Sequence, residues 1–254
     1  MKNTLLFLAL ISLIMACSPQ EETTKLDLDR YPESFQKVME QHGGLAVWNA
    51  QQVLRFERVN SAGNEVHTID LKSRQDKIES PDYALGYDGT QYWVKADTSF
   101  KRDPEFYHNL MFYFYAMPFV LADPGTYYTE KAPLEFEGKS YPGVAVSFGD
   151  DVGSSPKDDY IVYYNPETYQ MEWLGYTATF FTQERKTKFS YIRYGGWSKF
   201  NEVLLPTKLT WYRTDEAGAI TEARNSVNFE NIELQTSPMP EGTFAPVAGA
   251  KISE

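Results

Sequence analysis

The residue types that most often carry chemistry are few and scattered in this sequence of 254 residues. The three histidines, His42, His67 and His108, have no metal-ligand spacing to one another or to the single cysteine. No nucleophile elbow, phosphate loop or dinucleotide fingerprint is present in the sequence. We therefore expect no catalytic residue, no metal and no cofactor, and a structural or solvated role for each histidine.

Carboxylates gather in one stretch, "GDDVGSSPKDD" at 149–159, which holds Asp150, Asp151, Asp158 and Asp159. Oxygen ligands of this kind suit Ca²⁺, and paired carboxylates also serve hydrolases. The spacing is not that of a known calcium loop, so a solvated loop between strands is the favoured interpretation. Whether this loop binds Ca²⁺ stays open.

The most unusual stretch is "EFYHNLMFYFYAMPFVLADPG" at 105–125, which has no formal charge between its first residue and Asp123. Asp103 is a good N-cap, Pro104 suits the first helical position, and Pro118 disfavours continuation. These signals predict a helix from Pro104 to about Met117, about 21 Å long. Such a helix is too short to span a membrane.

This helix would be apolar on nearly every side, so it must be covered on more than one side. Lying across the mouth or interior of a curled sheet would cover it, and the run could then line an apolar binding cavity or form its lid. The alternative, that the same side chains only fill the protein's own core, stays open. The candidate ligand-binding residues are Trp93, Phe106, Leu110, Met111, Phe114, Tyr115, Met117 and Phe119.

The elements around this run are mostly strands. A helix is expected after Pro32, with Phe35, Val38 and Met39 on its apolar face, ending at the glycine pair 43–44. About eleven strands with short connections follow, which predicts a mainly β (α+β) fold with an antiparallel sheet that curls or closes. The expected strands are 53–59, 66–73, a hairpin within 83–97, a second hairpin within 134–148, and 159–165, 171–181, 187–195, 205–213 and 222–236.

The last long strand contains a change of phase. Val227 and Phe229 lie on one parity, whereas Ile232 and Leu234 lie on the other. A β-bulge near Asn231 would bring both pairs to one face.

The N-terminus is typical of an exported protein. Residues 1–16 contain Lys2 and an apolar stretch from Leu5 to Met15, which predicts a signal peptide. "LIMAC" resembles the bacterial lipobox, in which the cysteine carries the lipid, so Cys17 is the candidate lipidation site. An ordinary secretory signal with an incidental cysteine is the alternative. Residues 17–30 would then be the lipidated cysteine and a flexible tether, and 31–254 a single domain.

Charge narrows the set of partners. The formal net charge of −11 disfavours nucleic acid and anionic membrane surfaces as partners. Contact with a membrane is therefore expected through the lipid on Cys17 rather than through surface charge.

Four segments together resemble a family. "HGGLAVWNA" (42–50), "FYFYAMPFVLADPG" (112–125), "YYNPETYQMEWLGY" (163–176) and "LPTKLTWYR" (205–213) are similar to a domain of unknown function in secreted bacterial lipoproteins. The order of elements resembles the LolA-like superfamily of lipoprotein carriers and lipid-binding lipoproteins. That resemblance implies an unclosed half-barrel covered by helices, with an apolar cavity for acyl chains. The expected anchor favours a receiver, holder or sensor of lipid over a shuttle.

Two functions follow as hypotheses. The first is a monomeric, non-enzymatic lipoprotein of the bacterial cell envelope, on the periplasmic or surface face of the outer membrane, that binds lipid or the acyl chains of a lipoprotein. The alternative is a surface scaffold that binds glycan or protein through Trp197, Trp173 or nearby loops and has a filled core. A hydrolase that uses the aspartate stretch is the least favoured interpretation.

Overall fold

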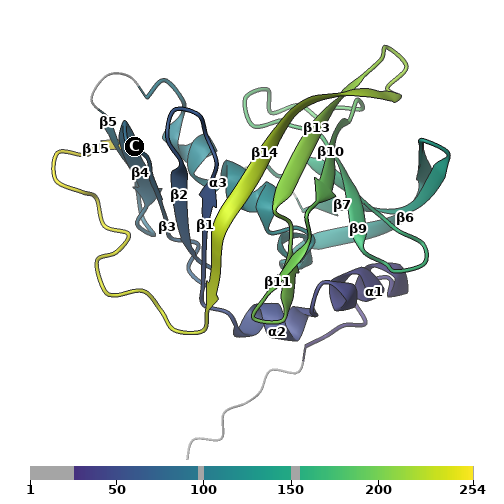
Figure 1. Ribbon diagram of the computed structural model, residues 1–254, viewed down its shortest axis with the longest axis horizontal. Coiled ribbons are helices and arrows are strands. Elements are labelled where there is room, and N and C mark those ends of the chain that lie inside the picture. The colour runs from purple at the N-terminus through teal and green to yellow at the C-terminus, as the bar shows by residue number, and fades with distance from the viewer. Residues whose placement is uncertain (1–25, 97–99, 150–154, 254) are drawn as a thin grey trace, which may run out of the picture.

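The computed structural model describes residues 26–96, 100–149 and 155–253. In this part of the chain one sheet of thirteen strands runs in the order β15-β5-β4-β3-β2-β1-β14-β13-β10-β9-β8-β7-β6. The pairings are antiparallel, and β15 and β6 stand at opposite edges, so the sheet is unclosed. Figure 1 shows the sheet curving around helix α3, with α1 and α2 packed at its lower rim. The mainly β, antiparallel and unclosed fold expected from the sequence is confirmed.

The strands are short apart from three, β6, β7 and β14, which exceed nine residues. Their bounds are β1 Val53–Arg58, β2 Glu65–Asp70, β3 Asp76–Glu79, β4 Tyr83–Tyr87, β5 Tyr92–Ala96, β6 Thr126–Phe136, β7 Lys139–Phe148, β8 Asp159–Tyr164, β9 Met171–Tyr176, β10 Ser190–Gly195, β11 Ser198–Phe200, β12 Val203–Leu205, β13 Lys208–Thr214, β14 Ile220–Gln235 and β15 Lys251–Ser253.

The sheet has more strands than the roughly eleven expected. The two additional strands are β3, which lies between β2 and β4, and β15, which stands at the edge; β11 and β12 pair separately as a small two-stranded sheet. These four are three or four residues long, too short to show an alternating pattern in the sequence. Strand β6 also begins at Thr126, well before the hairpin expected within 134–148. The sequence did not predict its first part because its mostly exposed side chains give no apolar pattern.

Strand β14 contains the predicted irregularity. Its first part pairs with β13 and its last part with β1, where Arg55 faces Glu233 but Glu57 faces Glu230. The extra residue on β14 falls at Asn231, whose φ of 49° is left-handed. The bulge changes the phase of the strand, so that Phe229 and Leu234 are both buried.

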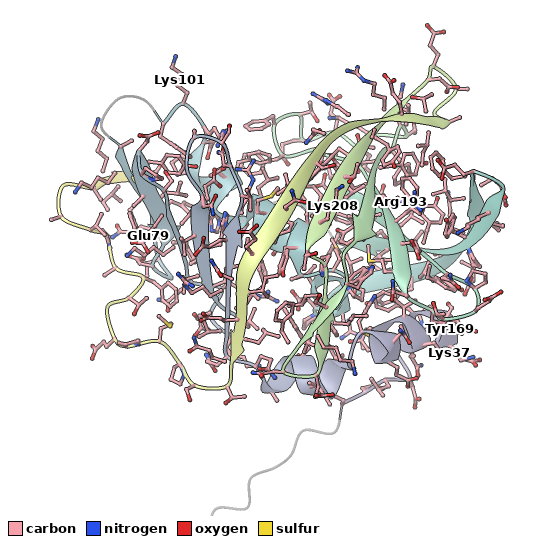
Figure 2. All side chains as sticks on the ribbon, viewed as in Figure 1. Lys37, Glu79, Lys101, Tyr169, Arg193 and Lys208 are labelled. Carbon is pink, nitrogen blue, oxygen red and sulfur yellow. The ribbon has the colours of Figure 1, made fainter. Side chains whose placement is uncertain are left out.

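Two short helices precede the sheet. Helix α1 (Glu33–Gln41) buries Phe35, Val38 and Met39, as the spacing predicts, and α2 (Leu45–Ala50) follows the glycine pair. Figure 2 shows Lys37 of α1 beside Tyr169 of the β8–β9 turn, and its ammonium lies 5.1 Å from the centre of that ring. Helix α1 therefore closes the end of the curved sheet near β8 and β9.

Helix α3 (Pro104–Tyr115) forms where the sequence predicts it and ends two residues earlier than expected. The Asp103 carboxylate accepts a hydrogen bond from the Phe106 amide at 3.2 Å, so the predicted N-cap is present. A short 3₁₀ helix, η1 (Phe119–Ala122), follows and is buried. The Tyr194 hydroxyl donates to the Phe114 carbonyl at 2.6 Å and fixes the C-terminal turn of α3 to β10.

Several expectations lie outside the described residues. These are the signal peptide at 1–16, the lipidation of Cys17, most of the tether up to residue 30, and Asp150 and Asp151 of the aspartate stretch. Among the described residues, no helix is both long and apolar enough to cross a membrane.

Candidate functional site

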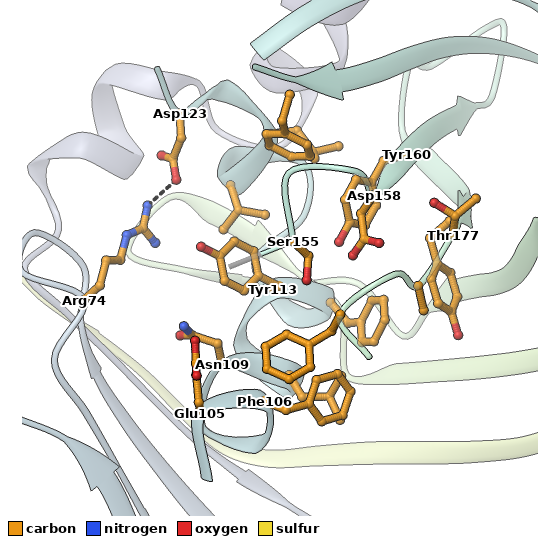
Figure 3. Close-up of a pocket in the computed structure, with 18 residues that line it drawn as sticks. Arg74, Glu105, Phe106, Asn109, Tyr113, Asp123, Ser155, Asp158, Tyr160 and Thr177 are labelled. Atoms are coloured by element: carbon orange, nitrogen blue, oxygen red, sulfur yellow. Dashed lines mark hydrogen bonds and ion pairs between the residues drawn. The ribbon is translucent and has the colours of Figure 1, made fainter. Parts of the chain in front are cut away.

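A cavity of about 510 Å³ lies between α3 and the ends of strands β7, β8 and β9 (Figure 3). This volume is within the range of roughly 300–1,000 Å³ that is usual for small-molecule sites. Aliphatic and aromatic side chains form most of its wall. The run at 105–125 therefore borders open space as well as core.

Helix α3 forms one wall. Phe106, Leu110, Tyr113 and Phe114 line the cavity at the helical spacing that brings residues three and four apart onto one face. Phe114 is mostly buried, whereas the other three are only partly buried, because the cavity lies beside them. The buried residues of α3, among them Met111 and Tyr115, pack into the core on its other sides. The helix is thus covered on more than one side, as its composition requires.

Strand ends form the opposite wall. Phe148 ends β7, Tyr160 lies in β8 and Tyr176 ends β9. The rings of Phe148 and Tyr160 have centroids 5.8 Å apart, and Phe114 reaches across to Tyr176 at 4.8 Å. These contacts join α3 to the sheet at one end of the cavity.

An aromatic cluster stands beside this wall. Phe106 packs on Phe180 at 5.1 Å and on Phe181 at 4.9 Å between ring centroids. Phe106 and Phe180 line the cavity, while Phe181 is 71% exposed. Amide hydrogen bonds from residues 182 and 183 to the Thr179 carbonyl hold this turn. A large apolar side chain is thus presented to solvent next to the cavity.

Polar groups occupy the other end. Arg74, in the β2–β3 turn, donates from Nη2 to the Asp123 carboxylate at 2.7 Å, and its guanidinium lies 5.0 Å from the Phe112 ring centre. Arg74 has a φ of 62°, a left-handed conformation that non-glycine residues seldom adopt. Burial raises the pKa of Asp123, and the attraction of Arg74 opposes that rise. The same two residues also border a second pocket of about 360 Å³.

Further polar groups lie on the sheet side. The Asp158 carboxylate accepts from the Thr179 amide at 2.6 Å and is 8% exposed. Burial raises the pKa of Asp158, and it raises the pKa values of Tyr160 and Tyr113 as well. In each of these groups the mainly apolar surroundings disfavour the charged form relative to the same group in water.

The eight candidate ligand-binding residues divide into two groups. Phe106, Leu110 and Phe114 line the cavity. Met111, Tyr115, Met117 and Phe119 are buried in the main hydrophobic cluster. Trp93 is fully buried in β5, where its indole donates to the Phe244 carbonyl at 3.0 Å, and it is not among the residues that line the cavity.

The sequence did not predict the residues of the cavity wall that faces α3. Phe148, Tyr160, Tyr176 and Phe180 belong to separate strands and one loop, and only the strand order brings them to α3. Arg74 gave no signal either, since a lone arginine in a turn is common.

Among the described residues, the tryptophans, histidines and aspartates that the sequence offered as candidate functional residues are packed against or paired with other residues. Trp173 is fully buried, and Trp197 stacks on His42 with centroids 4.5 Å apart, so neither forms an exposed aromatic platform. The three histidines are buried. Across the described ranges, no three His, Cys, Asp or Glu side chains gather as metal ligands would. Asp159 pairs with Arg185 at 3.1 Å.

The fold and site define an open antiparallel sheet that holds an apolar cavity beside a central helix. Residues 99–195, which include α3 and the strands on the opposite wall, match a sequence family described as a family of unknown function (DUF6503). No curated protein matches the chain. The resemblance to a domain of unknown function that the sequence suggested is thus confirmed for this part of the chain.

Three of the solved structures with a similar course of the chain are the following. A LolA superfamily protein from Nitrosomonas europaea is 10% identical, with a TM-score of 0.47, and the match covers 82% of this chain and 96% of that chain. An outer membrane lipoprotein-sorting protein domain from Vibrio parahaemolyticus, described as putative, is 10% identical, with a TM-score of 0.44 and coverages of 84% and 95%. A DUF1329 family protein from Desulfovibrio piger ATCC 29098 is 10% identical, with a TM-score of 0.44 and coverages of 78% and 91%. Structural neighbours therefore include LolA superfamily members, as the resemblance implied, but similarity at this level carries no information about ligands.

Proposed function

We propose that this protein is a membrane-anchored, non-catalytic lipoprotein that binds an apolar ligand, either a lipid or the acyl chains of a lipoprotein. The observation that carries the proposal is the cavity of about 510 Å³, lined mainly by apolar side chains of α3 and the sheet. An apolar cavity needs few polar contacts for affinity, because each buried methylene contributes roughly 0.8 kcal/mol. Ten methylenes would contribute roughly 8 kcal/mol, against which the entropy cost of association must be set.

The remaining parts of the proposal concern location. Cys17 would carry the lipid after removal of residues 1–16, and residues up to 30 would tether one domain, 31–254, to the membrane of the bacterial cell envelope. A monomer suffices, because α3 and the sheet of a single chain form the cavity. The glycan- or protein-binding alternative lacks support from the two tryptophans that suggested it, since both are packed against other residues.

The test uses the polypeptide from Ser18 to Glu254, which keeps every described residue and lacks the lipidated cysteine. Native mass spectrometry after gentle purification, followed by lipid extraction, should detect a bound lipid. A fluorescent acyl probe should bind in a saturable manner. If no lipid co-purifies and no probe binds, the proposal is wrong.

A pair of matched variants locates the binding. Ala178 borders the cavity and is exposed, so Ala178→Trp adds bulk to the site without removing a core side chain. Ala217, on the exposed β13–β14 turn, gives the control Ala217→Trp. We expect roughly tenfold weaker probe binding for the first and no change for the second. Equal binding by both variants would place the ligand elsewhere.

A further inference from the structure

Among the charged side chains of the cavity wall, acidic residues outnumber basic ones. Of the described residues that line it, Arg74 is the one cation, while Glu105, Asp123 and Asp158 are carboxylic acids. Arg74 is already paired with Asp123 at 2.7 Å, so that pair contributes no net charge. Glu105 and Asp158 are left without a cation among the lining residues. The Lys186 ammonium, which donates to the Ala178 carbonyl, attracts Asp158 but forms no ion pair with it.

Hydroxyl groups lie near one of these carboxylates. Asp158 immediately precedes β8, Tyr160 is the second residue of that strand, and both line the cavity. Figure 3 shows the Tyr160 hydroxyl, the Asp158 carboxylate and the Ser155 hydroxyl on the same side of the cavity, facing Tyr113 on α3. Hydroxyls both donate and accept hydrogen bonds, and a carboxylate accepts them. This subsite is therefore suited to a head group that brings its own donors.

An anionic head group would meet a different environment. A carboxylate placed beside Asp158 would lose its hydration and face a like charge in a partly buried, low-dielectric site, where charge repulsion is stronger than in water. A neutral head group that carries hydroxyls would avoid that penalty and could donate to the same carboxylate.

We propose that the cavity selects amphiphiles with an uncharged, hydroxyl-bearing head group and discriminates against carboxylates such as free fatty acids. This inference rests on the proposed function, because it assigns a ligand class to the same cavity. The acyl chain lies along the apolar face of α3, and the head group lies at the subsite formed by Ser155, Asp158 and Tyr160.

The experiment compares two ligands with the same chain and different head groups. Monooleoylglycerol and oleate are titrated separately at pH 8 against a bound fluorescent acyl probe, with the Ser18–Glu254 polypeptide and below the micellar range. We expect monooleoylglycerol to bind at least roughly tenfold more tightly than oleate. This comparison needs no variant, so it does not depend on whether a substitution folds.

A variant and its neighbour assign the effect to one charge. Asp158→Asn keeps an acceptor for the Thr179 amide and removes the charge. It should raise oleate affinity roughly tenfold and leave monooleoylglycerol affinity within about twofold. Asp159→Asn is the control, because Asp159 pairs with Arg185 and is not among the lining residues.

The outcomes separate the two proposals. Equal or tighter binding of oleate by the parent polypeptide would overturn the head-group selection and leave the apolar cavity function standing. An Asp158→Asn variant that changes both affinities alike would also overturn it. If neither ligand nor the probe binds, the proposed function itself is wrong, and the head-group selection falls with it.

Discussion

The Tyr107 hydroxyl donates to both carboxylate oxygens of Glu65, at 2.9 Å to Oε1 and 2.9 Å to Oε2. Tyr107 lies on α3 and Glu65 on β2, so this bond joins the central helix to the sheet on the side away from the cavity. At the next residue of α3, His108 Nδ1 lies 2.9 Å from the buried Asp76 carboxylate of β3. Polar contacts thus fix one face of α3, while another face borders the cavity.

The first prediction concerns this attachment. Tyr107→Phe removes the hydroxyl and leaves Glu65 with His67 at 3.4 Å and with Arg58 and Tyr83, each at 2.7 Å. Because the lost hydrogen bond is to a charged group, we expect the free energy of unfolding to fall by about 1.5–3 kcal/mol, measured by urea denaturation. Tyr127→Phe, at an exposed position of β6, is the control and should change it by less than about 0.5 kcal/mol. A Tyr107→Phe protein as stable as the control would show that this bond does not hold α3.

A second prediction concerns the pH dependence of stability that follows from the lowered pKa of Glu65. Burial raises its pKa, but hydrogen bonds from His67 and Tyr83 and the attraction of Arg58 outweigh burial and hold the pKa at about 2, below its ordinary value of 4.5. The folded state therefore releases this proton more readily than the unfolded state. The resulting stability is fully present above pH 4.5 and is lost as the pH falls toward about 2, by up to about 3 kcal/mol. Glu65→Gln should flatten the decline of stability in this window, whereas Glu216→Gln, on an exposed turn, should leave it unchanged.

A third prediction concerns His42. Burial lowers the pKa of His42 from 6.5 to about 3, and its Nε2 accepts a hydrogen bond from the Met171 amide at 3.2 Å. The folded protein therefore keeps this ring neutral where the unfolded chain would bind a proton. Stability should fall by about 1.4 kcal/mol for each pH unit below 6.5, down to about pH 3. Nitrogen NMR shifts of the ring at pH 4.5 should show a neutral imidazole in the folded protein and a protonated one in urea; a protonated ring in the folded protein would contradict this.

The sequence predicts helix α3 but does not distinguish the side chains of α3 that pack into the core from those that line the cavity. Asp103, Pro104 and the uninterrupted apolar run defined the helix, because capping and periodicity are local. The bulge at Asn231 was also local, since two parities within one strand revealed it. The opposite wall of the cavity depends on which strands neighbour one another, and single-strand patterns do not contain that order. Leu110 and Met111 therefore looked alike, although one lines the cavity and the other is buried in the core.

These two neighbours give a fourth prediction. Leu110→Arg places a long side chain at the cavity wall, where its charged end can reach water, so the variant should fold and lose binding of the acyl probe at least roughly tenfold. Met111→Glu buries a carboxylate without a partner and should lower the free energy of unfolding by more than about 3 kcal/mol. Circular dichroism and urea denaturation measure folding, and probe titration measures binding. A Leu110→Arg protein that is unfolded would show that this face of α3 is core.

The last prediction concerns the glycine pair after α1, where the sequence signal and the structure agree. Gly43 has a φ of 109° and Gly44 a φ of 87°, conformations that cost an L-residue with a side chain about 1–3 kcal/mol. They differ in their surroundings, because a Cβ on Gly43 would collide with the backbone carbonyl oxygen of Glu202, whereas one on Gly44 would meet nothing within 4 Å.

Both alanine variants should therefore be less stable than the parent, and Gly43→Ala should be the less stable of the two by at least about 1 kcal/mol, because a backbone oxygen cannot rotate away as a side chain can. Urea denaturation of the two variants side by side measures the difference. Equal stabilities would mean that the turn between β11 and β12, which carries Glu202, moves freely from the end of α1. The amide of Leu204 donates to the His42 carbonyl at 2.9 Å and opposes such movement.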